Sequence, residues 1–173
     1  MDDPAPQGAH DCLAACCALA LEWLRGTNPR EARKVLARSL AEMSQGATFG
    51  NARILLASSF GVESEVVSGS LERMLELSGA RGLVLLGVNP RLLYPGASAG
   101  RHAVVLAACS RRPSSSWAGR QLDVAEAGPP ARIAIIDAAE TGAPRRRIDA
   151  ALLAAAFDAA GREGLLIYPG NFA

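Results

Sequence analysis

The order in which two hydrophobic patterns follow one another constrains the fold of this chain most. In the first half, apolar residues recur every three or four positions, as they do along one face of an amphipathic helix. In the second half they gather in short runs with β-branched members, which are typical of buried strands. Helices that precede the strands, rather than alternate with them, predict an α+β fold with an antiparallel sheet.

Each helix expected in the first half begins at a residue that can cap it. The expected helices cover residues 12–25, 30–43, 51–60 and 71–77. Their caps are Asp11, Asn28, Asn51 and Ser70. Gly26 and Gly61 follow the first and third helices and are expected to end them, and a short strand is expected over 62–67.

The second half is expected to supply most of the sheet. Its strands are predicted over residues 83–88, 101–109, 132–137 and 165–168, and one alanine-rich helix over 148–160. Two prolines and two glycines predict a loop over 89–100. Residues 110–130 are predicted to connect two antiparallel strands as a long hairpin, with a short ribbon at 121–124. The three arginines at 145–147 follow Ala143-Pro144 and are predicted to form a solvated turn.

Composition limits the classes of protein that this chain can belong to. It has 173 residues, half of them hydrophobic, which predicts one domain over 1–173. A formal net charge of +1 without a basic stripe gives no support for nucleic-acid binding. We find no signal peptide and no membrane span. Three of the four cysteines lie close together, at positions 12, 16 and 17, which is poor spacing for a set of disulfides. We therefore expect reduced thiols and a cytoplasmic protein. The many alanines and arginines suggest a bacterial source.

Cys12 is the strongest candidate for chemistry. It is expected in the first turn of a helix, where the helix dipole stabilises a thiolate, and the thiolate is the nucleophilic form of cysteine. Gln7 precedes it and has a side-chain amide that can donate to an oxyanion. The competing interpretation is that Cys12 simply fills the core of an amphipathic helix.

His102 and Asp137 are the candidate partners of that thiol. His102 begins a predicted strand and Asp137 ends the strand expected beside it, and neighbouring antiparallel strands hold side chains within reach of each other. A histidine can take the thiol proton and return it to a leaving amine, while an aspartate fixes its orientation. Either residue is also commonplace at a strand end without any catalytic role.

Two further arrangements are weighed against this one. His10 is the other histidine and lies two residues before Cys12, where an exposed position is expected. A zinc site formed by Cys12, Cys16, Cys109 and a histidine lacks paired C-x-x-C spacing, so we expect no metal and no cofactor.

Four motifs, in this order, resemble the double-glycine-leader peptidases, which are papain-like domains found in bacteriocin-exporting transporters. They begin with Asp11-Cys12-Leu13-Ala14-Ala15-Cys16 before an apolar helix. Phe60-Gly61-Val62-Glu63 follows, and then Gly100-Arg101-His102-Ala103-Val104-Val105. The last is Ile135-Ile136-Asp137-Ala138-Ala139-Glu140. The resemblance spans nearly the whole chain and implies a papain-like fold, with an N-terminal helical half packed on a C-terminal antiparallel β-sheet.

The same resemblance implies a cysteine peptidase acting on a peptide or protein through an acyl-enzyme. Cys12 would attack, His102 would serve as base and acid, Asp137 would orient it, and Gln7 would line the oxyanion hole. Three positions depart from the family pattern: Leu13 replaces a glycine, Gln7 stands one residue closer to the cysteine, and Ala138 replaces a proline. The 110–130 segment is also longer than usual, and any exporter would be a separate partner.

Two alternative functions stay open at this point. The same three residues suit a deamidase or acyltransferase, because side-chain amides react through the same thioester. A catalytically inactive domain that binds a peptide or a partner is the other alternative, with Leu13 crowding the substrate.

Overall fold

The structure is a computed structural model that describes residues 9–98, 100–107, 132–140 and 142–170, without the side chains of residues 9 and 10. Four of the features considered above lie outside the described residues: Gln7, Cys109, the predicted hairpin connection over 110–130 and its ribbon.

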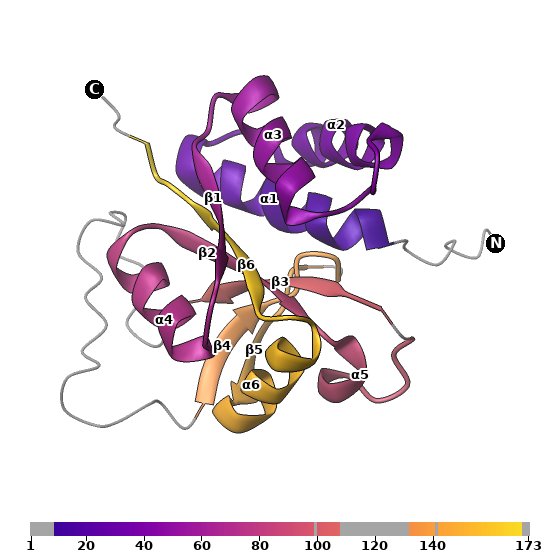
Figure 1. The fold of residues 1–173 in the computed structure, drawn as a ribbon. Coiled ribbons are helices and arrows are strands. Elements are labelled where there is room, and N and C mark those ends of the chain that lie inside the picture. Colours follow the sequence, from indigo (N-terminus) through magenta and orange to yellow (C-terminus); the bar gives the residue numbers. More distant parts are fainter. Residues whose placement is uncertain (1–8, 99, 108–131, 141, 171–173) are drawn as a thin grey trace.

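Three helices form a layer at one side of the molecule (Figure 1). They are α1 (Ala9–Arg25), α2 (Pro29–Glu42) and α3 (Phe49–Phe60). The α2 helix begins as predicted, because the Asn28 side chain accepts hydrogen bonds from the backbone N–H groups of Arg30 and Glu31. Gly61 ends α3 in a left-handed conformation, with φ at 61°, which a glycine adopts without strain.

Two of the predicted helix caps are wrong. The α1 helix includes Ala9, so Asp11 lies within its first turn, and its carboxylate is 3.6 Å from the guanidinium of Arg33 on α2. At α3 the cap is Thr48, whose hydroxyl accepts from the backbone of Asn51. The Asn51 amide instead donates to the carbonyls of Ser44 and Gly46 and so fastens the preceding turn.

The sheet has six strands, and every neighbouring pair is antiparallel, as predicted. The strands are β1 (Ser64–Ser68), β2 (Leu83–Val88), β3 (His102–Ala107), β4 (Arg132–Ile136), β5 (Arg145–Asp149) and β6 (Glu163–Ile167). Their order across the sheet is β1-β6-β2-β3-β4-β5. The strand from the N-terminal half, β1, therefore lies at one edge of a sheet that the C-terminal half mostly builds.

Two segments differ from the prediction. The arginines at 145–147 are not in a turn, because their backbone forms the edge strand β5 and pairs with β4 from Ile136↔Arg145 to Arg132↔Asp149. The three arginine side chains are exposed, so the sequence lacks the alternation of apolar and polar residues that predicts a strand. The predicted loop over 89–100 contains a short helix, α5 (Pro90–Leu93), which Asn89 caps.

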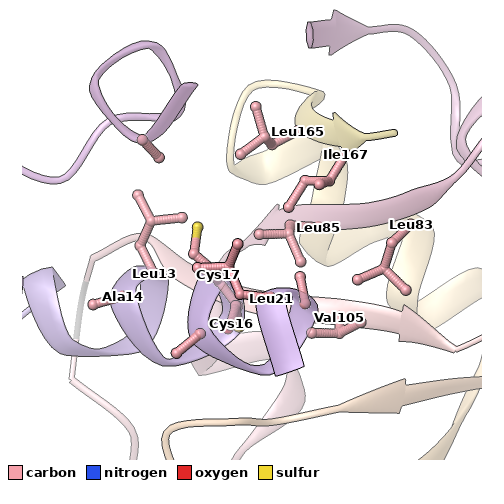
Figure 2. Packing of buried hydrophobic residues seen from close by; sticks show 14 of the residues in the cluster. Leu13, Ala14, Cys16, Cys17, Leu21, Leu83, Leu85, Val105, Leu165 and Ile167 are labelled. Atoms are coloured by element: carbon pink, nitrogen blue, oxygen red, sulfur yellow. Dashed lines mark hydrogen bonds between the residues drawn. The ribbon is translucent and has the colours of Figure 1, made fainter. Parts of the chain in front are cut away.

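Helices cover both faces of the sheet. The α1–α3 layer packs on one face, where alternate strand residues such as Leu83 and Leu85 point toward it. Figure 2 shows Cys16, Cys17 and Leu21 of α1 in this apolar packing with Leu85 and Val105. The intervening residues, such as Val84 and Leu86, face α4 (Leu71–Ala80) and α6 (Ala150–Ala159). The expected packing of helices on the sheet is confirmed, and α4 and α6 add a second helical layer.

Candidate active site

The topology brings His102 and Asp137 to the same end of the sheet. His102 is the first residue of β3, and Asp137 directly follows the last residue of β4. Because the two strands are antiparallel, the start of one lies beside the end of the other. The register Val105↔Ile136 makes the two side chains diagonal neighbours, two positions apart, rather than directly opposed.

The imidazole and the carboxylate form a short hydrogen bond. His102 Nε2 is 2.6 Å from Asp137 Oδ2, and the Asp137 side chain is only 2% exposed. The other carboxylate oxygen, Oδ1, accepts the backbone N–H of Ala139 at 3.2 Å. Both oxygens of Asp137 therefore have donors, and the carboxylate is fixed relative to the ring.

The Cys12 side chain forms a hydrogen bond with the same imidazole. Since Nε2 faces Asp137, the ring nitrogen left for the sulfur is Nδ1. Cys12 is the fourth described residue of α1, in its first turn, and Figure 1 shows that end of α1 close to the start of β3. The structure thus brings together the thiol, the imidazole and the carboxylate that the sequence analysis singled out.

The charges of this group support one another. Burial alone would lower the pKa of His102, but its hydrogen bonds to Asp137 and Cys12 and their negative charges outweigh burial and raise the pKa to about 9. Burial favours the neutral form of Asp137, but the bond from His102 and the positive charge of the ring lower its pKa below the ordinary value. The stable state near neutral pH is therefore an imidazolium beside a carboxylate.

Cys16 and Cys17 lie in a different environment, one turn further along α1. Both are completely buried, whereas Cys12 is 6% exposed. Burial is the main cause that raises the pKa of Cys16 well above its usual value and that of Cys17 to about 12. The Cys16 thiol donates to the backbone carbonyl of Ala103 at 3.3 Å. These two thiols are neutral packing groups.

Leu13 was expected to crowd the substrate, but its side chain packs into the apolar cluster beneath α1 and is 3% exposed. Leu13 therefore offers no specific obstacle at the surface beside Cys12. The structure gives no reason to expect that Leu13 makes the chain inactive.

A neighbour that sequence reasoning missed is Tyr94, which follows α5. Its ring meets that of His102 edge to face, with centroids 5.9 Å apart. The Arg146 guanidinium carbon lies over the Tyr94 ring, 5.3 Å from its centre. No periodicity marks Tyr94, because it stands in a proline- and glycine-rich segment that sequence patterns identify only as a loop.

The other candidate residues receive no support from the described part of the chain. Gln7 and Cys109 lie outside it, and only the backbone of His10 is described, within α1. In the described ranges, no group of three or more histidine, cysteine, aspartate or glutamate side chains is placed to hold a metal ion. Within those ranges, too, no helix combines the length and the apolar character that crossing a membrane requires.

Comparison with known proteins yields a structural neighbour but no sequence relative. No protein family model and no curated protein matches the chain. The crystal structure of a protein from Bacillus anthracis, provisionally named a C39-like peptidase, superimposes with a TM-score of 0.61. The match covers 95% of this chain and 90% of that one, at 12% sequence identity. The chain therefore has the α+β fold of this C39-like peptidase, which bears out the predicted fold class.

Proposed function

We propose that this chain is a cysteine peptidase in which Cys12 is the nucleophile, His102 the base and acid, and Asp137 the residue that orients the histidine. The observation that carries the proposal is the doubly engaged imidazole: Nε2 is 2.6 Å from the Asp137 carboxylate, and the same ring is bonded to the Cys12 thiol. The fold shared with a C39-like peptidase supports the same activity.

The chemistry follows from this arrangement. With the proton that Cys12 and His102 share held on Nδ1 of His102, the Cys12 sulfur forms a bond with the carbonyl carbon of the scissile peptide. When the tetrahedral intermediate collapses, the C–N bond breaks and the imidazolium gives its proton to the leaving amine. A water molecule, deprotonated by His102, then attacks the thioester, and the acid product leaves as the thiol is restored.

Asp137 contributes through the histidine. Its carboxylate accepts from Nε2–H, which fixes the ring with Nδ1 toward the sulfur and stabilises the imidazolium form. Gln7 is proposed to donate its amide to the oxyanion. The substrate proposed from the family resemblance is a peptide with a double-glycine leader junction, and the proposed setting is the bacterial cytoplasm.

Thiol alkylation tests the triad directly. The full chain is treated with iodoacetamide at neutral pH, and the labelled cysteine is identified by mass spectrometry. We expect rapid labelling at Cys12, loss of that labelling in His102→Ala, and nearly unchanged labelling in the matched control His10→Ala. Labelling that is unchanged in His102→Ala, or absent from Cys12 in the wild type, would overturn the triad.

Product masses then separate the activities. With a double-glycine leader peptide, a peptidase yields two fragments whose masses sum to the substrate plus one water. A deamidase yields one product in which an amide has become an acid, and an acyltransferase yields an adduct. A chain whose Cys12 labels rapidly but which leaves every peptide unchanged would contradict the peptidase and leave a binding domain.

A further inference from the structure

The backbone of Tyr94 is held firmly beside the site. Its N–H donates to the carbonyl of Pro90 at 2.8 Å, and its own carbonyl accepts from Ala97 at 3.1 Å. The α5 helix before it is fastened to α6, because the backbone N–H of Asn89 donates to the Ala156 carbonyl at 2.9 Å. Tyr94 thus presents its ring from a fixed point.

The ring of Tyr94 contacts a group on each of two strands. It meets the His102 ring of β3 at an interplanar angle of 90° and a centroid separation of 5.9 Å, which is a favourable edge-to-face geometry. Arg146 of β5 lies over the Tyr94 ring at 5.3 Å. The guanidinium is itself held by both oxygens of Glu140, at 2.8 and 2.6 Å.

The hydroxyl of Tyr94 interacts with the Asp137 carboxylate. It is buried and has no hydrogen-bond partner of good geometry among the described residues. Burial raises the pKa of Tyr94, and the negative charge of Asp137 raises it further, so the hydroxyl stays neutral. The part of Tyr94 that contacts the imidazole is its ring.

An imidazole needs more than its two hydrogen bonds to keep one orientation. The bond between the ring and its β-carbon allows rotation with a broad preference, so a packed neighbour is what restricts it. The groups that face the His102 ring are Asp137 from the end of β4, Cys12 from α1 and Tyr94 from the end of α5. Tyr94 is the aromatic group among these.

We propose that Tyr94 is a positioning residue whose ring holds the His102 imidazole with Nε2 on Asp137 and Nδ1 toward Cys12. This inference rests on the proposed triad, because it assigns Tyr94 a role only through His102. Arg146, which Glu140 holds, contributes by packing over the Tyr94 ring.

The test compares Tyr94→Leu, which removes the aromatic ring, with Tyr94→Phe, which removes only the hydroxyl. Tyr168→Leu is the matched control, because Tyr168 is the second of the two tyrosines and bonds to Glu65 on the far edge of the sheet. Two quantities are measured on the full chain: the alkylation rate of Cys12 and the pKa of His102 by NMR. The chain has only two histidines, so a His10→Asn background leaves a single imidazole to follow.

We expect Tyr94→Leu to alkylate at least about tenfold more slowly, since small misplacements of reacting groups cost this much or more. The pKa of His102 should fall from about 9 toward 6.5, because a freely rotating ring loses the bonds that raise it. Tyr168→Leu should keep wild-type values for both quantities, and Tyr94→Phe should stay much closer to the wild type than Tyr94→Leu does. A residue that only filled space would lower the melting temperature without changing the pKa of the imidazole in the folded protein.

Wild-type alkylation and an unchanged His102 pKa in Tyr94→Leu would overturn the inference. So would equal losses in Tyr94→Phe and Tyr94→Leu, which would assign the effect to the hydroxyl. If Tyr94→Leu does not fold, Tyr94→Met is judged by the same criteria, because its flexible side chain fills more of the space. The triad itself fails separately, when His102→Ala labels as fast as the wild type.

Discussion

Two consecutive turns of α1 each carry a cysteine, and the two thiols have different hydrogen-bond partners. Cys12 meets the imidazole of His102, whereas Cys16, four residues later, donates to the backbone carbonyl of Ala103. The partners of the two thiols are consecutive residues of β3. One thiol therefore faces a side chain that can exchange a proton, and the other faces a carbonyl that cannot.

This difference shows that the partner, rather than the residue type or the helix, decides what a thiol can do. Cys16 and Cys17 are completely buried and their pKa values are raised, so they remain protonated near neutral pH. The group around Cys12 is charged, with an imidazolium held by Asp137. A distance of one helical turn separates a proposed nucleophile from core packing.

The largest effect on activity is expected when Cys12 is replaced by alanine and the result is compared with the same replacement at Cys16. Cys12→Ala should abolish alkylation and peptide hydrolysis, because no other described thiol faces a base. Cys16→Ala should retain both activities and instead lower the free energy of unfolding by about 1–2 kcal/mol, since it removes a buried sulfur and its hydrogen bond. Mass spectrometry and urea denaturation measure the two quantities. Activity that survives in Cys12→Ala, or vanishes in a folded Cys16→Ala, would break the comparison.

A smaller loss is expected when the charge behind the histidine is removed. Asp137→Asn keeps the shape of the side chain but not its negative charge, so the pKa of His102 should fall and the rate of hydrolysis should drop about 10²- to 10⁴-fold. Asp11→Asn is the control, because that carboxylate pairs with Arg33 on the surface of α2. Steady-state kinetics over a pH series measures both. Equal rates in Asp137→Asn and the wild type would remove Asp137 from the proposed mechanism.

The smallest effect concerns stability against pH. The pKa of His102 is about 9 in the folded chain and 6.5 when unperturbed, so the stabilisation from its charged form is complete below pH 6.5 and is lost as the pH rises through 9. Its upper bound is about 3–4 kcal/mol, from the size of this shift. Asp137 acts in the opposite direction: its stabilisation is present above its ordinary pKa and is lost in acid.

Urea denaturation at pH 6 and pH 10 checks this expectation in the wild type and in His102→Gln. The wild type should lose more free energy of unfolding between the two pH values than the variant does. The buried Cys16 and Cys17 also lose stability over this interval, because their thiols ionise near pH 9 in the unfolded chain and stay protonated in the fold. The wild type and His102→Gln share this loss, so it cancels from the comparison. Equal losses in the two proteins would mean that the charged imidazole does not stabilise the fold.

Local patterns predicted most of the elements because the relevant forces act over a few residues. The caps at Asn28 and Ser70 were predicted correctly, and so was Gly61 at the end of α3. The strands β2, β3, β4 and β6 were visible as apolar runs, since burial requires apolar side chains. β5 was missed because its pairing with β4 uses only backbone groups, while its arginine side chains stay in water.

The sequence by itself determined the α+β class and three candidate groups, because cysteine, histidine and aspartate in these local contexts suit one kind of chemistry. Only the tertiary structure brought them together: the antiparallel pairing of β3 with β4 joins His102 to Asp137, and the packing of α1 on the sheet brings in Cys12. The tertiary structure also buries the Leu13 side chain in the core and places the Tyr94 ring in contact with the imidazole. Contacts between residues far apart in the chain depend on register and packing, which local periodicity does not encode.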